Sequence, residues 1–410
     1  MNILFVHQNF PAQFKNLAPL LAADASNRVV ALTMRTDVPH KWRNVDVFSY
    51  NLAGIPVANT VSWLSDFEAK TIRAEACYQA AQKLNASGFK PDIIVAHPAW
   101  GESLFLKEVW PNAKLAIYCE FFYSEIGLDV GFDVEQSLAY PIDLHRFSLK
   151  NMNNLLHFQI ADAGISPTQW QASTFPEAFQ KKITVIHDGI DTAVAKPNPN
   201  VKLLIANNIM LTKEDEVITF VSRELEPYRG YHILMRALPL LLKRRPNAKV
   251  LIVGGNGTAY GQKAATGTSW AELFAREAHS QIGEEAWKRV HFLGKISYEH
   301  YLSVLQLSSA HIYLTYPFVL SWSLMEAMSV GCPVVASDTG PVQELIEDGK
   351  TGLLTPFFDV EALVARIDCV LSDRKLGQTL GNEARNWIIQ RYDLSSVSAP
   401  RQVEWLTSLA

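Results

Sequence analysis

The sequence has few cysteines and no surplus of positive charge, and both shortages narrow the classes of protein that it can encode. Its 410 residues include four cysteines, scattered in apolar segments without a CxxC pair: Cys77, Cys119, Cys332 and Cys369. We therefore expect reduced, buried thiols in a cytosolic protein, not a disulfide framework. The 37 basic and 41 acidic residues give a formal charge of −4, which provides no general attraction to nucleic acid.

Long hydrophobic runs and a secretion signal are also missing. No stretch reaches the roughly 20 consecutive apolar residues that a membrane span needs, and the chain opens directly on a strand-like MNILFV. We expect a cytoplasmic protein. A short basic stretch, Lys243 to Arg245, leaves open peripheral contact with the inner face of a membrane, although a solvated helix end is the simpler interpretation.

Patterns that hold metal ions are absent as well. The sequence has no HExxH motif, no Cys/His cluster and no DxD-type pair in a suitable loop after a strand. We therefore expect neither a metal ion nor a bound cofactor.

What the sequence does contain is enough apolar material for more than one domain. Hydrophobic residues make up 48% of the 410 positions, and short β-rich runs alternate with helical segments throughout. The expected strands are 3–6, 28–33, 92–97, 114–120 and 164–166, with 183–191 ending the first series, and then 217–222, 249–255, 290–294, 311–314, 333–337 and a final strand after Gly352. The main expected helices are 13–23, 66–84, 232–243, 270–278, 298–308 and 322–330, followed by a helical region over 360–409. This alternation predicts an α/β protein with parallel, doubly wound sheets.

A polar stretch with Pro197 and Pro199 separates the two series of strands and has the composition of an interdomain linker. We predict one Rossmann-like domain over 1–195, a second over 200–390, and a terminal segment over 391–410. Ligands of such sheets collect beyond the carboxyl ends of the strands.

The segment from Tyr313 to Leu354 carries the most specific pattern. Ser321 is placed to cap the helix 322–330, and Gly331 is placed to end it. The amino end of that helix directs backbone N–H groups and the positive end of a dipole toward the preceding loop, which favours a phosphate.

Several motifs in this segment together form a family pattern: Glu326-Ala327-Met328, GCPVVAS over 331–337, Glu344-Leu345-Ile346 and DGKTGLL over 348–354. With them, the chain resembles the retaining glycosyltransferases of family 4, also called glycosyl transferases group 1. The resemblance implies the GT-B fold, in which two Rossmann-like domains face each other across a cleft. It further implies that the first domain binds an acceptor, the second binds a nucleotide sugar, and the last helix packs back on the first domain.

The activity implied by the resemblance is transfer of a hexose-type sugar with retention at the anomeric carbon. The co-substrate would be a nucleotide diphosphate sugar, most simply a UDP- or GDP-sugar. The acceptor would be a saccharide, a lipid-linked or a small molecule in glycan or glycoconjugate biosynthesis. In a front-side reaction the departing phosphate takes the acceptor proton, so a dedicated protein base is not required.

One position departs from the family pattern. The family has two glutamates eight positions apart; the second corresponds to Glu326, whereas the first falls on Phe318. The resemblance assigns the ribose hydroxyls to Glu326. Since a phenyl ring cannot accept hydrogen bonds from sugar hydroxyls, the donor sugar is expected to lie against Phe318 and the backbone N–H groups of Val319 and Leu320, near Ser321.

The first loop of the second domain begins at Ser222 and contains two arginines. Arg223 and Arg229 flank a turn, and their guanidinium groups suit bidentate contact with a diphosphate. Arg229 stands where the family has a lysine, with one residue more between the two cations. As the glycosidic bond breaks, charge accumulates on the diphosphate, so preplaced cations stabilise the transition state more than the ground state. Two ordinary surface arginines are the simpler alternative.

Two further segments of the second domain are candidates for nucleotide contacts. Gly255 belongs to a VGGNG loop after a strand, which either cradles a phosphate or is plain turn chemistry. By resemblance, Lys295 and Ile296 lie where the family's backbone contacts the nucleobase.

In the first domain, polar residues follow the ends of several expected strands. Glu120 stands where the family more often has a histidine near the donor sugar, and is either a catalytic carboxylate or a hydrogen-bonded structural one. Gln8, Asn9 and His97 are candidates for acceptor contacts, and His7 is more simply a satisfied strand-end histidine.

Two other functions fit the same fold. The departures at Phe318 and Glu120 motivate a noncatalytic nucleotide-sugar-binding subunit of a glycosylation complex, and a sugar-nucleotide epimerase is the third hypothesis. The sequence names neither the sugar and base of the donor, nor the acceptor, nor the oligomeric state.

Overall fold

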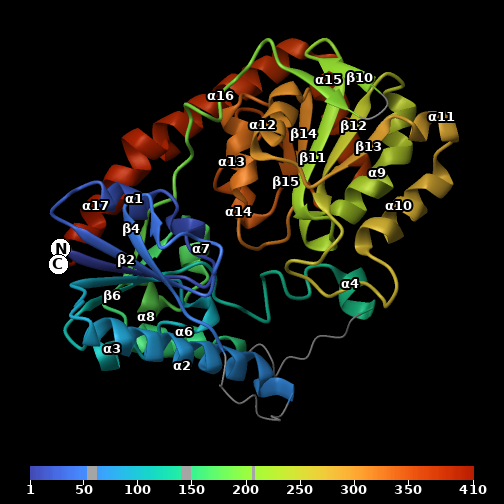
Figure 1. The fold of residues 1–410 in the computed structure, drawn as a ribbon. Helices are drawn as coiled ribbons and strands as arrows, with labels where there is room; N and C mark the ends of the chain where they lie inside the picture. Colours follow the sequence, from blue (N-terminus) through green and yellow to red (C-terminus); the bar gives the residue numbers. More distant parts are fainter. Residues whose placement is uncertain (53–61, 140–148, 206–207) are drawn as a thin grey trace. The chain divides into compact units, whose positions relative to one another are not determined.

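The computed structural model describes residues 1–52, 62–139, 149–205 and 208–410, which divide into two compact units (Figure 1). Unit 1 comprises Met1–Ile126, Pro141–Gly189 and Leu394–Ala410, and unit 2 comprises Gly127–Tyr140 and Ile190–Asp393. The chain therefore first enters unit 2 directly after Ile126, far before the linker that its composition indicates.

Unit 1 is built on a sheet that, over the described residues, has the strand order β3-β4-β2-β1-β5-β6-β7-β8. All neighbouring pairs are parallel except β3 with β4. The strands are β1 (Asn2–Val6), β2 (Arg28–Thr33), β3 (Lys41–Trp42), β4 (Val45–Ser49), β5 (Ile93–Ala96), β6 (Lys114–Tyr118), β7 (Ala163–Ser166) and β8 (Ile183–Val185). The order reverses between β1 and β5, so the switch point of this sheet lies at their carboxyl ends.

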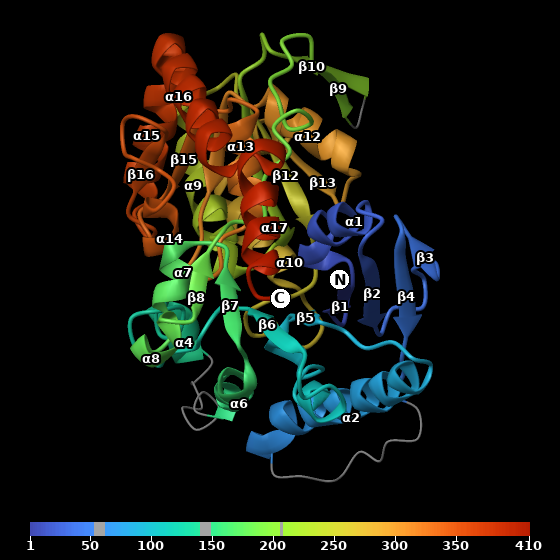
Figure 2. The same cartoon turned by 90° about the vertical axis from the view of Figure 1, so that its left-hand side faces the viewer.

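Helices cover both faces of this sheet because its central strands are apolar on both sides. They are α1 (Leu17–Ala22), α2 (Ser65–Ala86), α3 (Leu106–Val109), α6 (Met152–Ile160), α7 (Gln169–Ser173), α8 (Glu177–Gln180) and α17 (Ala399–Thr407). Leu4 and Val6 of β1 pack in one core with α2, α3 and α6, whereas Ile3 and Phe5 pack in the opposite core with α1 and α17. Figure 2 shows α17, at the carboxyl end of the chain, beside α1.

Unit 2 contains a parallel sheet with the order β13-β12-β11-β14-β15-β16 among the described residues, and an antiparallel hairpin of β9 and β10. The strands are β9 (Lys202–Ile205), β10 (Ile209–Thr212), β11 (Val217–Glu224), β12 (Lys249–Gly255), β13 (Val290–Gly294), β14 (Ala310–Tyr313), β15 (Val334–Ser337) and β16 (Leu353–Thr355). Its order reverses between β11 and β14, which places the switch point of unit 2 at the loops that follow these two strands.

The helices of unit 2 again lie on both faces of the sheet. They are α4 (Val134–Ala139), α9 (Tyr231–Arg244), α10 (Trp270–Gln281), α11 (Glu284–Trp287), α12 (Tyr298–Leu307), α13 (Trp322–Ser329), α14 (Gly340–Gln343), α15 (Val360–Ser372) and α16 (Arg374–Tyr392). One core joins α12, α13 and α16 to Tyr313, Val334 and Ala336 of the sheet. On the other side, Phe220 of β11 contacts Tyr231 of α9, with ring centroids 6.3 Å apart.

Several elements differ from the expectations. The helix expected over 13–23 is a 3₁₀ turn, Ala12–Phe14, followed by α1, and the helical region over 360–409 is interrupted by a π-helical turn at Leu394–Ser398. The hairpins β3-β4 and β9-β10 are additional. Their short strands bury at most every second side chain. In β9, for example, Leu203 and Ile205 face a core while Leu204 is exposed. Such short, half-buried strands give little periodic signal in the sequence.

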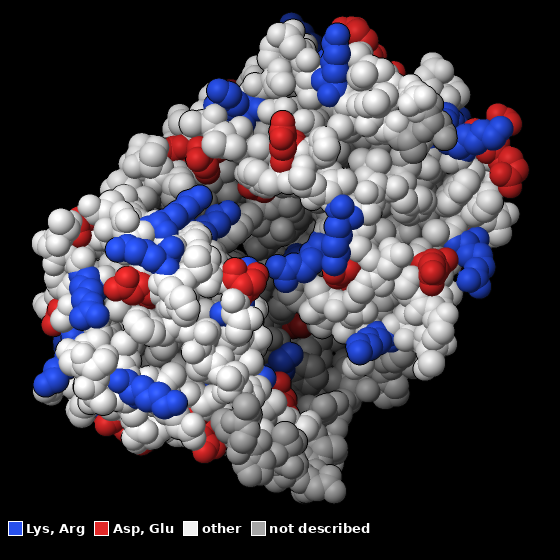
Figure 3. Space-filling model, in the orientation of Figure 1, with Lys and Arg blue, Asp and Glu red and all other residues white. Residues whose placement is uncertain are grey.

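Charges of both signs are scattered over the surface drawn in Figure 3, with uncharged areas between them. The basic stretch at the end of α9 is partly engaged, since Arg245 pairs with Glu216 and, at 3.2 Å, with Asp368. Within the parts of the chain that are described, none of the helices combines the length and apolar character needed to cross a membrane.

Candidate functional site

The loops at the switch point of unit 2 bring together the two stretches that the sequence singles out. One is the end of β11 with the β11–α9 loop, where Arg223 belongs to the strand and Arg229 to the loop, and the other is the β14–α13 loop, from Leu314 to Ser321. Gly230 makes their approach close: its φ is +69°, and a Cβ there would collide with the side chain of Leu314.

Arg229 connects the two loops directly. Its Nη1 donates to Thr315 Oγ1 at 2.7 Å and to the carbonyl oxygen of Val319 at 3.0 Å. Its guanidinium carbon also lies 4.9 Å from the centre of the Tyr260 ring. The side chain is buried, with 7% of its surface exposed, so a cation is held at the switch point by a fixed set of contacts.

Ser222 and Arg223, expected at the start of this loop, lie instead in the last residues of strand β11. Arg223 is exposed, whereas Ser222 is half-buried and its hydroxyl donates to the carbonyl oxygen of Glu224 at 2.7 Å. The two arginines therefore differ: Arg229 is fixed in place, and Arg223 is a solvated cation.

Phe318 lies in an aromatic cluster, which we define as Tyr228, Tyr260, Tyr316 and Phe318. The Phe318 ring meets Tyr228 edge-on at 5.5 Å and Tyr260 at 5.2 Å between centroids, and 7% of Phe318 is exposed. Tyr228 and Tyr316 lie 4.6 Å apart. The residue in place of the family's first glutamate thus packs against the loop that carries Arg229 and against the ring that stacks on Arg229.

The amino end of α13 follows this cluster. As expected, Ser321 is the N-cap, and its hydroxyl accepts from the backbone N–H of Ser323 at 3.2 Å. The N–H of Ser321 donates to the Tyr313 hydroxyl at 3.0 Å, which ties the cap to strand β14. Leu320 is buried in the core beneath α13, and Val319 is half-buried, with its carbonyl on Arg229.

Glu326 is held by two tyrosines that the sequence interpretation did not single out. The hydroxyls of Tyr298 and Tyr301, both on α12, donate to Oε1 and Oε2 of Glu326, each at 2.7 Å. Burial and the nearby carboxylate raise the pKa of both hydroxyls. A carboxylate oxygen can accept more than one hydrogen bond, so each oxygen keeps capacity for a ribose hydroxyl. The sequence does contain a signal for this pair: Tyr298 and Tyr301 are three residues apart in an expected helix, which places both side chains on the same face.

We predict that Tyr301→Phe weakens binding of a ribonucleoside diphosphate about tenfold, because the charged carboxylate of Glu326 loses the hydrogen bond that the Tyr301 hydroxyl donates to it. Binding of the 2′-deoxy analogue should change less, since it lacks one of the hydroxyls that Glu326 would receive. The exposed Tyr298 provides the control, and Tyr298→Phe should have a smaller effect. Calorimetry with both nucleotides checks this, and equal losses for the two would contradict a role through Glu326.

Gly255 is required by its neighbours. A Cβ there would overlap the Glu224 carboxylate and the Lys295 side chain, which contact each other at 2.5 Å. Glu224 also accepts from the N–H of Gly257 at 2.7 Å. Burial tends to raise the pKa of Glu224, but the bonds from Lys295 and Gly257 outweigh it and lower that pKa. The Glu224 carboxylate therefore already accepts the hydrogen bond of one N–H group of the glycine loop, that of Gly257. Ile296, next to Lys295, packs against a core cluster.

Glu226, in the same loop as Arg229, was not among the candidates. It is fully buried, and it accepts from the backbone N–H groups of Ala259, Tyr260 and Gly261 at 3.2 to 3.3 Å. Burial raises the pKa of Glu226. By holding this backbone, Glu226 fixes Tyr260 where it stacks on Arg229. No periodic or motif signal in the sequence indicates this long-range contact.

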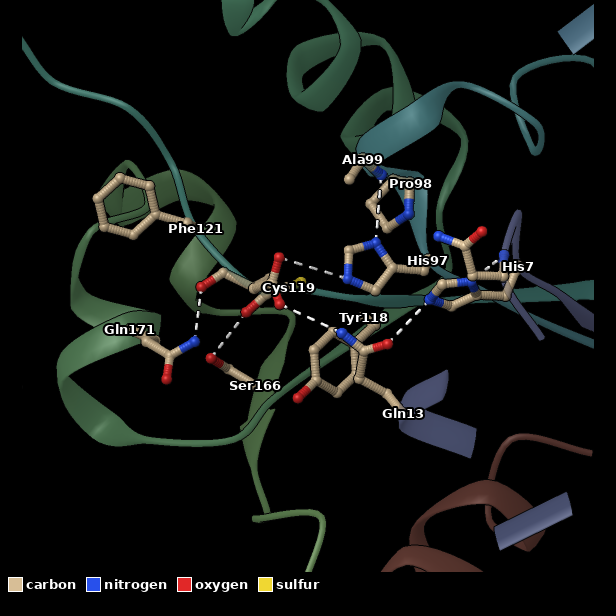
Figure 4. Close-up of polar contacts among 12 residues, drawn as sticks. His7, Gln13, His97, Pro98, Ala99, Tyr118, Cys119, Phe121, Ser166 and Gln171 are labelled. Carbon is tan, nitrogen blue, oxygen red and sulfur yellow. Dashed lines mark hydrogen bonds and ion pairs between the residues drawn. The ribbon is translucent and has the colours of Figure 1, made fainter. Parts of the chain in front are cut away.

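At the switch point of unit 1, hydrogen bonds link His7, Gln13 and Glu120, and His97 lies beside Glu120 (Figure 4). His7 Nε2 lies 2.8 Å from Gln13 Oε1, and Gln13 Nε2 donates to Glu120 Oε1 at 3.2 Å. His97 Nε2 lies 3.6 Å from Glu120 Oε2. Nδ1 of each histidine accepts a backbone N–H, from Asn9 and from Ala99, so Nε2 is the ring nitrogen that can donate toward Gln13 or Glu120. Gln13 is the member that strand-end reasoning could not find.

Gln8 and Asn9 lie on the loop after β1. The carbonyl oxygen of Gln8 accepts from Thr33 Oγ1 at 2.9 Å, and its side-chain Oε1 is buried without a hydrogen-bond partner in the described part of the chain. Asn9 is exposed. His7, Gln8, His97 and Glu120 are thus brought to one edge of the sheet, as the strand order requires.

Acid should destabilise unit 1 through His7. Burial, with a further contribution from His97, lowers the pKa of His7 from 6.5 to about 3. The unfolded chain then binds one proton more than the folded chain between these values, so the free energy of unfolding falls as the pH drops below about 6.5, by at most about 1.4 kcal/mol per pH unit. Denaturant titrations from pH 7.5 to 4.5 should show a shallower decline for His7→Gln than for the unchanged chain. Identical slopes would contradict the buried neutral histidine.

Over the described residues, no group of three or more His, Cys, Asp and Glu side chains is arranged to hold a metal ion.

Two doubly wound parallel sheets, one with a fixed arginine and a helix amino end at its switch point, define the GT-B class of fold. Residues 25–195 match the family described as glycosyl transferase family 4 group, and residues 204–387 match the glycosyl transferases group 1. Taken together, the two matches show that the chain is a GT-B protein of the glycosyl transferases group 1.

Individual relatives are more distant. The phosphatidyl-myo-inositol mannosyltransferase of Mycolicibacterium smegmatis is 31% identical over 46% of this chain and 44% of its own length. A GDP-mannose-dependent α-(1-6)-phosphatidylinositol monomannoside mannosyltransferase of the same organism is 26% identical over 72% of each chain. The match to the first of these relatives therefore spans less than half of that protein.

Among solved structures, Anabaena HepE in complex with UDP and glucose has the same fold. It is 20% identical over 100% of both chains, with a TM-score of 0.67. The likeness concerns the fold alone.

Proposed function

We propose that this chain transfers a hexose-type sugar from a nucleotide diphosphate sugar to an acceptor, with retention at the anomeric carbon and without a metal ion. The observation that carries the proposal is Arg229, a buried cation held between the β11–α9 and β14–α13 loops at the switch point of unit 2. The family resemblance and the general rule that ligands bind at the carboxyl ends of parallel strands both indicate a ligand site at the switch point of unit 2.

Transfer of the sugar is faster when positive charge lies beside the diphosphate leaving group. The bond from the anomeric carbon to the diphosphate oxygen breaks while the bond to the acceptor oxygen forms on the same face, and the departing phosphate oxygen takes the acceptor proton. Arg229, the solvated Arg223 and the N–H groups at the start of α13 would stabilise the charge that develops on the diphosphate. Glu326, oriented by its two tyrosines, would hold the ribose.

The donor proposed is a UDP- or GDP-sugar. The relatives include a GDP-mannose-dependent enzyme, and the structurally similar HepE was solved with UDP and glucose. A saccharide, lipid-linked or small-molecule acceptor is proposed to bind at the switch point of unit 1, near Gln8, Asn9 and His97. Glu120, hydrogen-bonded to Gln13, is proposed as a catalytic carboxylate of unit 1.

The proposal is tested first by binding. Thermal shifts with UDP-, GDP-, ADP- and dTDP-sugars should single out one nucleotide, since a ligand at 100 times its dissociation constant adds about 2.7 kcal/mol to the free energy of unfolding. With that donor, the anomeric configuration of the product, followed by NMR, tests retention, and activity after chelator treatment tests metal independence. A chain that neither binds nor turns over any of these donors would contradict the proposal.

A noncatalytic nucleotide-sugar-binding subunit is the second candidate, favoured by the phenyl ring of Phe318 within an aromatic cluster where the family has a carboxylate. Slow hydrolysis of the bound donor that disappears in Glu326→Ala would decide for the enzyme. Interconversion of nucleotide sugars without an acceptor would instead indicate an epimerase.

A further inference from the structure

A short segment of the chain belongs to unit 2 although the strands that precede and follow it belong to unit 1. We call this segment the arm and define it as residues 127–137. It follows β6 and precedes α6 and β7, which are all in unit 1, yet its contacts place it in unit 2. Figure 1 shows the teal α4, which begins within the arm, with the elements of unit 2.

Two buried carboxylates of the arm each contact one loop of the switch-point site. The Tyr228 hydroxyl, on the β11–α9 loop, donates to Asp129 Oδ2 at 2.6 Å. The Tyr316 hydroxyl, on the β14–α13 loop, donates to Asp133 Oδ2 at 2.6 Å. Tyr228 directly precedes Arg229, and the N–H of Tyr316 donates to the carbonyl oxygen of Tyr228 at 3.0 Å. The arm is therefore bonded to both loops that Arg229 joins.

These contacts are strong by their chemistry. Asp129 and Asp133 are 5% and 3% exposed, and short O–H···O⁻ bonds of this kind are about twice as strong as neutral ones. Asp133 Oδ2 also lies 3.1 Å from His232 Nε2 on α9. Burial alone would raise the pKa of Asp133, but the bonds from His232 and Tyr316 lower it, so the carboxylate is charged at neutral pH. A buried charge with two partners is costly to build and needs those partners in place.

The rest of the arm is attached elsewhere. Glu135 forms two bonds of 2.7 Å with Arg236, which also contacts Glu277 at 3.1 Å, and all three residues are partly exposed. This attachment joins the arm to α9 and α10 and touches neither loop of the site. The chain thus contains its own control, an arm contact remote from the loops.

We propose that Asp129 and Asp133 are positioning residues of the nucleotide-sugar site. They hold Tyr228 and Tyr316 so that Arg229, Thr315 and Val319 stand ready for the diphosphate before it binds. This inference rests on the proposed function for the identity of the ligand. It gives the arm a task that neither family membership nor the sequence motifs assign.

The expected effect is on donor binding more than on turnover. When the loops are no longer held, the competent arrangement is populated only part of the time, and the apparent affinity falls by that fraction. Donor binding then restores the arrangement, so the saturated enzyme works at nearly its former rate. A general loss of folded protein would do the opposite, lowering the apparent kcat and leaving KM unchanged.

The test compares Asp129→Asn, Asp133→Asn and the control Glu135→Gln in the full chain. In the free protein, hydrogen exchange of the amides over 315–321 should be faster in the two Asp variants and unchanged in the control. With the UDP- or GDP-sugar that the unchanged chain uses, the donor KM of each Asp variant should rise about tenfold, with kcat within a factor of about two, whereas Glu135→Gln should keep both constants.

Unchanged exchange over 315–321 in folded Asp129→Asn and Asp133→Asn would overturn the inference, as would an unchanged donor KM in both. The exchange comparison requires no turnover. A chain that used no nucleotide sugar at all would contradict the proposed function, while exchange would still decide whether the arm holds the loops.

Discussion

Replacing Arg229 by alanine is expected to lower turnover of the donor by a few hundred-fold. Loss of one charge-assisted contact to a developing anion costs roughly 3 to 4 kcal/mol in the transition state. The effect should fall on kcat more than on KM, because the charge on the diphosphate is largest as it leaves. Steady-state kinetics with saturating acceptor measures both constants.

The same substitution should also lower the free energy of unfolding, by about 1 to 3 kcal/mol, because Thr315 Oγ1 and the carbonyl oxygen of Val319 lose their donor in a buried place. Arg223→Ala is the matched control, since the exposed Arg223 can be removed without a loss of stability. Arg229→Lys retains the charge without the planar fork, and should recover stability less than turnover. Normal turnover in a folded Arg229→Ala variant would exclude Arg229 from the diphosphate site.

The sequence predicts the parts of this site that depend on local order. The α/β class, the position of most strands and the Ser321 cap follow from period, composition and capping chemistry, which involve residues close in the chain. Because parallel strands end at one edge, Arg229 and the β14–α13 loop could be placed together before any coordinates.

What the sequence does not predict are partners far apart in the chain. Gln13 reaches Glu120 across 107 positions, and Tyr316 reaches Asp133 across 183. Such pairs leave no period or motif, since each residue alone is an ordinary polar or aromatic side chain. The arm illustrates the point, because only the contact pattern assigns 127–137 to unit 2.

The other large effect is expected at Phe318. Phe318→Ala should lower the free energy of unfolding by about 3 to 5 kcal/mol, as for a phenyl ring removed from a packed interior. Its ring contacts Tyr228 and Tyr260, and Tyr260 in turn stacks on Arg229, so a cavity there should also loosen the cation. Phe318→Leu, which keeps most of the apolar volume, should cost clearly less. Chemical denaturation measures both variants.

Phe318→Glu tests how the loop faces the donor. A carboxylate at 318 would accept hydrogen bonds from sugar hydroxyls, whereas the ring leaves a buried hydroxyl unpaired at a cost of roughly 1 to 3 kcal/mol, or about ten- to hundred-fold in donor preference. We therefore expect Phe318→Glu to change the order in which donor sugars are used. Glu326→Ala should weaken all sugars of the accepted nucleotide alike, because they share the ribose. If Phe318→Glu stays folded and active with the order of sugars unchanged, residue 318 serves the aromatic cluster alone, and the sugar is held elsewhere.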